Sequence, residues 1–137
     1  MIRKATDADT PYLCAFAARF HRAASLPGEY NAGAWARFVE TVHDQDGAFF
    51  LSERGMIGGL KMPQPWNDNY MTASEVCWWS EDKQGVALLN AFEDWAADCD
   101  EIHMMFLESL RPAAVMRYLQ SRGYVKGQTM MVKKCPS

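Results

Sequence analysis

Apolar residues recur along the chain at the spacings of strands and helices in turn. Residues 1–5 predict a short strand, and Thr6 and Asp9, three positions apart, resemble the capping box that opens a helix. Two helices should follow, one after Asp9 and one over residues 32–43, because each carries apolar side chains three and four positions apart. These stripes are Leu13, Phe16, Ala17 and Phe20 in the first helix, and Trp35, Phe38, Val39 and Val42 in the second.

A β-hairpin is predicted next, with strands at residues 48–53 and 56–62 joined by a turn at residues 54–55. The pair Gly58-Gly59 should weaken the second strand or mark a bulge, because glycine offers no side chain to pack. The stretch that follows reads PQPWNDNY, a composition that excludes regular structure. We interpret it as a loop over residues 63–70 whose Trp66 and Tyr70 either pack back onto the body or form a wall of a binding pocket.

The stretch 72–98 combines a strand, a glycine turn and a helix. An apolar run ends at Trp79, a polar turn containing Gly85 follows, and a helix extends to about Asp98. Its apolar face is made of Leu88, Leu89, Phe92, Trp95 and Ala96. The first N–H groups of a helix lack an intrahelical partner and the helix dipole adds positive charge there, so a phosphate can bind at such an end.

The C-terminal part predicts three further elements. Residues 102–107 are apolar and few, so we expect a buried strand parallel to the strand that ends at Trp79. Pro112 suits the first turn of a helix that ends at Gly123. A last hairpin should form around Gly127, with strands at 124–125 and 129–133. The predicted order is β-α-α-β-β-β-α-β-α-β-β in one domain over residues 1–137.

Size, charge and cysteine content narrow the class of protein. At 137 residues the chain is large enough to bury a core of its own. It has no apolar run near the roughly 20 residues that cross a bilayer, and its N-terminus lacks a secretory signal. The net charge of −3 argues against a nucleic-acid partner. The four cysteines form no CxxC pair, so we expect reduced thiols in a cytoplasmic protein and no metal site.

The stretch 72–98 resembles the core of the GCN5-related N-acetyltransferases (GNAT), which hold acetyl-coenzyme A on such a strand–turn–helix. The family's turn reads Q/R-x-x-G-x-G/A and usually continues x-A-L-L, and the sequence GVALL from Gly85 onward supplies its end. The beginning departs from the pattern, because Ser80 stands in place of Gln or Arg and Lys83 in place of the first Gly. If Gln84 instead opens the motif, the loop is shortened. Either way fewer free amides would face a pyrophosphate.

The resemblance extends to the opening IRKATDADTPYL and to the order of elements along the whole chain. It implies an α/β fold of the α+β mixed-sheet kind, with a central, mostly antiparallel sheet flanked by four helices. It also implies acetyl-CoA as cosubstrate, held in the gap where the fourth and fifth strands separate. The residues implied to contact acetyl-CoA are Cys77, Trp78, Trp79, Gln84, Gly85, Val86, Ala87 and Ser109.

Two residues are implied to be catalytic. Glu75 on the fourth strand is the candidate general base, and strand alternation would place it on one face with Cys77 and Trp79. A carboxylate among aromatics would have a raised pKa, although Glu75 could also lie at a solvated strand end or pair with a basic residue. Tyr118 is the candidate general acid, but it lies one residue farther from Gly123 than in the family and could instead pack against the sheet.

Three functions remain open. The first is an N-acetyltransferase that moves an acetyl group from acetyl-CoA to a primary amine of an unknown small molecule or protein. The second is a non-catalytic GNAT-like protein, of a kind seen in bacteriophages, that has lost efficient coenzyme A binding, as the altered turn and the shifted Tyr118 indicate. The third is a partner-binding α/β domain. We favour the enzyme, without nucleic-acid or membrane partners, as a homodimer paired through the run Met130-Met131-Val132.

Overall fold

The computed structural model describes residues 1–105, 107–110 and 112–136. It falls into two compact units, Met1–Met105 and residues 106–137, which we treat one at a time. The first unit holds a five-stranded sheet with three α-helices, and the second holds the fourth α-helix. The mixed sheet and the four helices confirm the fold class predicted from the sequence. Within the described residues, no helix is both long and apolar enough to cross a membrane.

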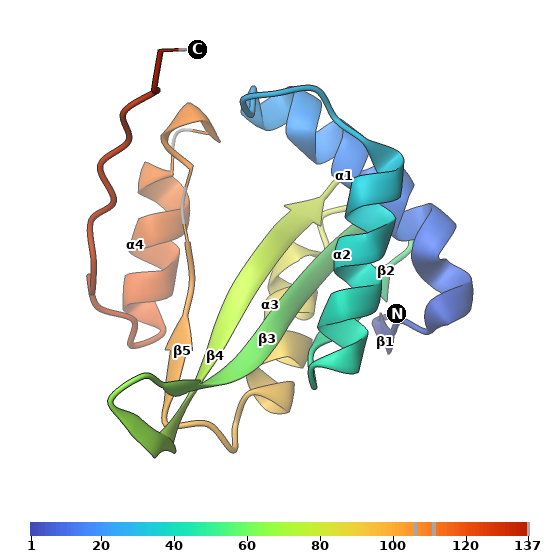
Figure 1. The fold of residues 1–137 in the computed structure, drawn as a ribbon. Helices are drawn as coiled ribbons and strands as arrows, with labels where there is room; N and C mark the ends of the chain where they lie inside the picture. The colour runs from blue at the N-terminus through green and yellow to red at the C-terminus, as the bar shows by residue number, and fades with distance from the viewer. Residues whose placement is uncertain (106, 111, 137) are drawn as a thin grey trace. The chain divides into compact units, whose positions relative to one another are not determined.

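The sheet has the order β1-β2-β3-β4-β5 (Figure 1). Its strands are β1 (Arg3–Lys4), β2 (Ala48–Ser52), β3 (Gly55–Gln64), β4 (Asn67–Ser80) and β5 (Glu101–His103). All neighbours pair antiparallel except β4 and β5, which run parallel because α3 carries the chain back between them. The sheet is therefore mixed and mostly antiparallel, as predicted.

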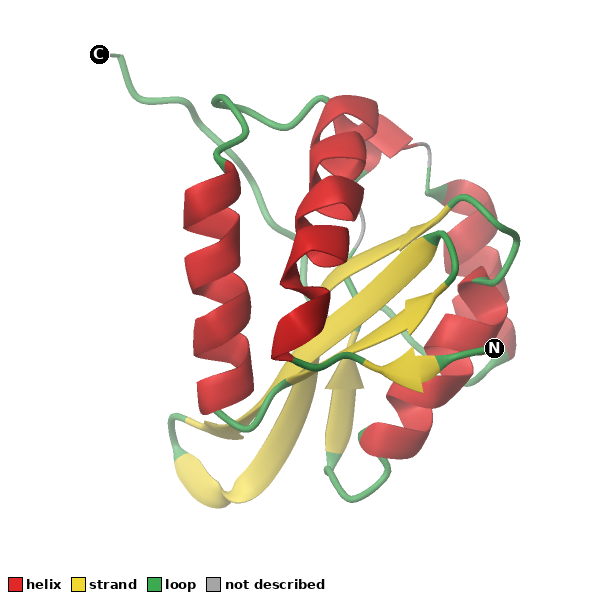
Figure 2. Cartoon of the chain, turned by 90° about the vertical axis from the view of Figure 1, so that its right-hand side faces the viewer, coloured by secondary structure: helices red, strands yellow, loops and turns green. Residues whose placement is uncertain are grey.

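Helices cover both faces of this sheet (Figures 1 and 2). Helices α1 (Thr10–Ala24) and α2 (Ala32–Asp44) lie on one face, and α3 (Gly85–Trp95) lies on the other. Two adjacent residues of β2 demonstrate this, because successive strand side chains point to opposite faces. The Phe49 ring contacts Trp35 of α2, whereas the Phe50 ring contacts Trp95 of α3. Most side chains of the apolar stripes predicted for these helices are thus buried, and the remaining ones, Phe20, Trp35, Phe38 and Trp95, are partly buried.

The predicted capping box links β1 to α1. Asp9 closes a short 3-10 helix, η1 (Asp7–Asp9), and accepts a hydrogen bond from the Thr6 backbone N–H at 2.8 Å. Its carboxylate also receives two hydrogen bonds from the Arg3 guanidinium, at 2.7 and 2.8 Å. These contacts, led by the bond from Arg3, hold the pKa of Asp9 well below its usual range.

The prediction of an irregular loop over residues 63–70 is wrong. Strand β3 continues to Gln64 and β4 begins at Asn67, so only a two-residue turn, Pro65-Trp66, separates them. Pro63 is tolerated because it lies next to a register irregularity, where its missing N–H interrupts little of the ladder. Trp66 is 81 % exposed, so it does not pack back onto the body.

Two predictions near the C-terminus need correction. The predicted strand parallel to β4 is present, but it is only the three-residue β5 and not residues 102–107. It is also not fully buried, since its central Ile102 is half-buried, and residue 106 lies outside the described residues. The last hairpin around Gly127 is absent, since the described residues after α4 form no strand and Val125 is 86 % exposed. A two-stranded hairpin is marginal without a surface to pack on, so an apolar run alone does not specify one.

In the second unit, a 3-10 helix, η2 (Glu108–Leu110), precedes α4 (Ala113–Ser121). Pro112 is the N-cap of α4, and Gly123 follows its end with φ of +97°, a conformation that favours glycine. The N–H groups of Gly123 and Tyr124 donate to the carbonyls of Gln120 and Leu119. Both predicted ends of this helix are confirmed to within a residue.

The bulge predicted at Gly58-Gly59 is present and shapes β4. Gly58 pairs with Cys77 and Gly59 with Glu75, so Val76 is an extra residue on β4. A Cβ at Gly58 would lie 2.4 Å from the Phe49 ring, and one at Gly59 would lie 2.4 Å from the Phe92 ring and 2.8 Å from the Ser74 carbonyl oxygen. Both glycines are therefore required by close packing on the two faces.

We expect Gly59→Ala to lower the free energy of unfolding by about 1–3 kcal/mol, because the new methyl group overpacks the contact with Phe92. Urea denaturation would measure this change. Gly127→Ala is the matched control, since a Cβ there meets no atom within 4 Å. Equal unfolding midpoints for the two variants would contradict the packing argument.

Candidate active site

Strand β4 extends beyond its pairing with β5. The parallel ladder joins only Thr72, Ala73 and Ser74 of β4 to residues 101–103. Residues 75–80 of β4 then continue beside β3 alone, as far as the described residues extend. The two strands therefore separate after Ser74, which is the arrangement that the GNAT resemblance implies for a pantetheine arm.

The bulge overturns the predicted alternation along β4. Val76 and Cys77 are consecutive, yet both pack against the core between the sheet and α1 and α2, as does Trp79. Glu75 pairs with Gly59, whose face is covered by Phe92 of α3, and paired residues share a face. Glu75 is thus not on one face with Cys77 and Trp79, because the inserted Val76 shifts the alternation by one residue.

Glu75 is buried at this separation, with 6 % of its surface exposed. Burial raises the pKa of its carboxyl to about 7, and a hydrogen bond donated by the Met105 backbone N–H opposes part of this rise. The alternative that Glu75 lies at a solvated strand end is therefore wrong. The ion pairs formed by the described residues do not include Glu75. A carboxyl that titrates near neutral pH can take up a proton during a reaction.

Cys77 is a poor nucleophile in this setting. It is 2 % exposed, and burial followed by the nearby charge of Glu75 raises the pKa of its thiol. A thiol held in its neutral form packs as a small apolar side chain. What Cys77 can offer to a ligand is therefore its backbone, as the resemblance implies.

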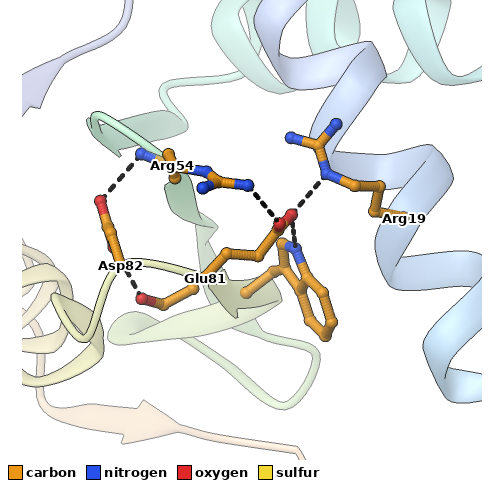
Figure 3. A network of polar contacts seen from close by, with 6 residues as sticks. Arg19, Arg54, Glu81 and Asp82 are labelled. Carbon is orange, nitrogen blue, oxygen red and sulfur yellow. Dashed lines mark hydrogen bonds and ion pairs between the residues drawn. The ribbon is translucent and has the colours of Figure 1, made fainter.

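The turn between β4 and α3 is stabilised by its own acidic residues, which the sequence did not indicate (Figure 3). The Asp82 carboxylate accepts hydrogen bonds from the Ser80 hydroxyl at 2.9 Å, the Arg54 N–H at 2.8 Å and the Gln84 N–H at 3.3 Å. Asp is a common turn residue because its side chain can accept a hydrogen bond from the backbone two residues further on, as Asp82 does from Gln84, and this signal could have drawn attention to it.

Glu81 fastens the same turn to two other elements. Its carboxylate accepts hydrogen bonds from Arg19 Nε of α1 and from Arg54 Nη2 of the β2–β3 turn, the latter at 3.2 Å (Figure 3). The Trp79 indole N–H donates to it at 3.1 Å. These contacts, led by the bond from Arg19, lower the pKa of Glu81.

The four turn residues predicted to face a pyrophosphate lie together at the start of α3. Gln84 is the N-cap, and its N–H is already bonded to Ser80 and Asp82. The N–H groups of Gly85, Val86 and Ala87 belong to the first turn, where a helix supplies no partner. The Gly85 carbonyl accepts a hydrogen bond from the Trp78 indole at 3.1 Å, which fixes Trp78 against this turn.

Tyr118 and Ser109 lie in the second unit. The Tyr118 hydroxyl accepts a hydrogen bond from Arg122 Nη1 at 3.0 Å, and the Arg122 guanidinium lies 5.6 Å from the centre of the Tyr118 ring. Ser109 is the middle residue of η2. Their roles as general acid and as coenzyme contact stay predictions from the resemblance.

The fold is that of the GCN5-related N-acetyltransferases. A protein of Clostridium acetobutylicum, described as a predicted acetyltransferase and solved with acetyl-CoA, matches with a TM-score of 0.74 at 12 % identity over 98 % of this chain and 95 % of its own. The ribosomal-protein-alanine N-acetyltransferase of Brucella melitensis matches with a TM-score of 0.71 at 11 % identity, over 98 % and 99 % of the two chains.

Glucosamine-6-phosphate N-acetyltransferase of Arabidopsis thaliana also matches, with a TM-score of 0.64 at 12 % identity over 98 % of this chain and 97 % of its own. No protein-family model matches the sequence. No curated protein sequence matches it either. The likeness is therefore one of structure, and it covers both units of the chain.

The raised pKa of Glu75 makes stability depend on pH in a definite direction. Between the ordinary pKa of 4.5 and about 7, the folded protein keeps a proton that the unfolded chain has lost, so raising the pH through this window favours unfolding. We expect the contribution of Glu75 to fall by about 3 kcal/mol between pH 4 and pH 8. Glu75→Gln cannot ionise and should lack this loss.

Urea unfolding at several pH values would measure the difference in stability between the wild type and Glu75→Gln. That difference should grow in favour of the variant as the pH rises. Glu40→Gln on the exposed side of α2 is the control, and it should leave the pH dependence unchanged. A constant difference between the wild type and Glu75→Gln at every pH would contradict the assignment.

Proposed function

We propose that the protein is an N-acetyltransferase that moves an acetyl group from acetyl-CoA to a primary amine. The observation that carries the proposal is the buried Glu75 carboxyl, which titrates near neutral pH at the point where β4 leaves β5. The acetyltransferase fold supports it, and one protein of this fold was solved with acetyl-CoA. Two of the structurally similar proteins are named for a ribosomal protein and for glucosamine-6-phosphate as acceptors. We therefore propose that the acceptor here is an amine of a small molecule or a protein.

The chemistry needs few groups. The amine nitrogen attacks the thioester carbonyl, a C–N bond forms, and the C–S bond breaks to release the coenzyme thiolate. Glu75 takes the proton that the amine loses, directly or through a water. A backbone N–H among Cys77, Trp78 and Trp79 polarises the thioester oxygen, and Tyr118 returns a proton to the thiolate.

The pantetheine arm would lie along β4 beyond Ser74, where the described strands leave its outer edge unpaired. The backbone of β4 would offer the pantetheine arm a run of N–H and C=O groups. The diphosphate would lie toward the first turn of α3, at Gly85, Val86 and Ala87, and Ser109 would supply a further hydrogen bond. Binding of this kind rests largely on main-chain groups, so it tolerates wide changes of sequence.

Replacing Glu75 tests the general base. We expect Glu75→Gln to lower kcat/KM about a hundredfold to a thousandfold at pH 7, because one positioned acid–base group contributes about that much. In the wild type kcat/KM should rise with pH through a pKa near 7, since only the ionised carboxylate accepts a proton, and the variant should lose this rise. A thiol-release assay with a panel of amines would measure it.

Calorimetric titration with acetyl-CoA separates binding from chemistry. Glu75→Gln should bind acetyl-CoA within about threefold of the wild type, and Glu40→Gln should match the wild type in both assays. Absence of binding at millimolar acetyl-CoA would overturn the enzyme and leave the alternative, a GNAT-like protein that no longer uses the coenzyme. That alternative draws on one observation, the Asp82 carboxylate bonded to the Gln84 N–H.

We also propose that the protein works in the cytoplasm as a homodimer. Met130, Met131 and Val132 are all more than three-quarters exposed in a segment without a strand, and pairing with a second copy would remove this apolar surface from water. The wild type should elute with light scattering at twice the mass of one chain, and Met131→Lys should elute as the monomer. Met62→Lys on the β3–β4 hairpin is the control. A monomeric wild type would refute this pairing.

A further inference from the structure

The turn before α3 contains a negatively charged side chain, the carboxylate of Asp82. The Asp82 carboxylate is bonded on one oxygen to the Ser80 hydroxyl and the Gln84 N–H, and on the other to the Arg54 N–H. Ser80 and Gln84 flank the turn, and Arg54 belongs to the neighbouring β2–β3 turn. Asp82 is thus fixed from two sides, close to the end of the helix where a phosphate would bind (Figure 3).

The carboxylate of Asp82 stays ionised and takes part in none of the ion pairs of the described residues. Burial acts to raise the pKa of Asp82, but the hydrogen bonds from the Arg54 N–H and its other partners outweigh burial and lower it. Glu81 is paired with two arginines, whereas among the described residues no cationic side chain forms an ion pair with Asp82. A diphosphate placed at Gly85, Val86 and Ala87 would therefore be repelled by a fixed negative charge. It would also lack the Gln84 N–H as a donor, because this group is already bonded to Ser80 and Asp82.

The pantetheine arm meets no such obstacle. Its contacts would be with the main chain of β4 at residues 75–80, before the turn begins. An amide-rich, uncharged arm is also not repelled by Asp82. The chain therefore favours binding of the pantetheine arm of the donor and disfavours binding of its diphosphate.

We propose that Asp82 is a specificity-determining residue that cancels most of the binding energy of the coenzyme's diphosphate, so that the protein selects its acyl donor by the pantetheine arm. The inference rests on the proposed acetyl transfer. The donor class is acyl thioesters of pantetheine, and acetyl-CoA is only one member of it. The reaction is unchanged, since a C–N bond forms, the C–S bond breaks and a pantetheine thiol leaves.

The first test uses the wild-type protein and two donors, acetyl-CoA and S-acetylpantetheine, which lacks the nucleotide and all three phosphates of the coenzyme. We expect kcat/KM for the two donors to agree within about fivefold. A loss of a hundredfold or more with S-acetylpantetheine would overturn the role of Asp82 while leaving acetyl transfer in place. Failure of both donors to bind or react would overturn the proposed function and this inference together.

The second test is Asp82→Asn, whose side-chain oxygen can still accept a hydrogen bond from the Gln84 N–H. Removing one charge beside the phosphates should tighten acetyl-CoA binding about tenfold and leave S-acetylpantetheine binding unchanged. Asp68→Asn, near the start of β4, makes the same change in net charge and should alter neither. Equally tighter acetyl-CoA binding in both variants would show an effect of net charge alone and would overturn the proposal. Unchanged acetyl-CoA binding in an Asp82→Asn protein with the melting temperature of the wild type would overturn it as well.

Discussion

The close contact of Gly58 and Gly59 with two phenylalanine rings is the constraint from which the geometry of the site follows. Phe49 covers one glycine and Phe92 the other, so β3 has no room for a Cβ at either position. The bulge opposite them adds Val76 to β4 and turns the strand there. As a result Glu75 faces away from Cys77, and β4 leaves its parallel partner directly after Ser74. The bulge at this packed pair of glycines thus sets the direction of the Glu75 side chain, and the opening beside it begins at the next residue, where the ladder between β4 and β5 ends.

Three acidic residues near the end of β4 differ in chemistry because their surroundings differ. Glu75 is buried and forms no ion pair with another described residue, and its pKa rises to about 7. Glu81 is more exposed and bonded to two arginines, and its pKa falls. Asp82 is held by neutral donors, and its pKa also falls. Composition alone cannot separate a carboxyl with a raised pKa from two carboxylates with lowered pKa values, since the difference arises from burial and partners.

The sequence predicted the helices, the capping box and the bulge well, because periodicity and glycine placement are local signals. It failed at residues 63–70, where pairing between β3 and β4 overrode a loop-like composition, and at residues 129–133, where an apolar run found no strand to pair with. The face of Glu75 was predicted wrongly because one inserted residue reverses strand alternation. Asp82 went unnoticed because its partner Arg54 lies 28 residues away in sequence and is brought close only by the fold.

The site also suggests why so distant a sequence can keep this fold. Neighbours at 11 and 12 % identity share it over nearly their whole length. A donor held by the main chain of β4 places little demand on side chains, whereas a diphosphate held on a helix end needs a turn free of acidic groups. A chain that relies on the first contact can therefore accumulate acidic residues in the turn, and Glu81 and Asp82 then stabilise the turn instead of the ligand. Under the proposed function, acidic residues at positions 81 and 82 stabilise the turn but lower its affinity for phosphate, so the turn cannot be optimised for both.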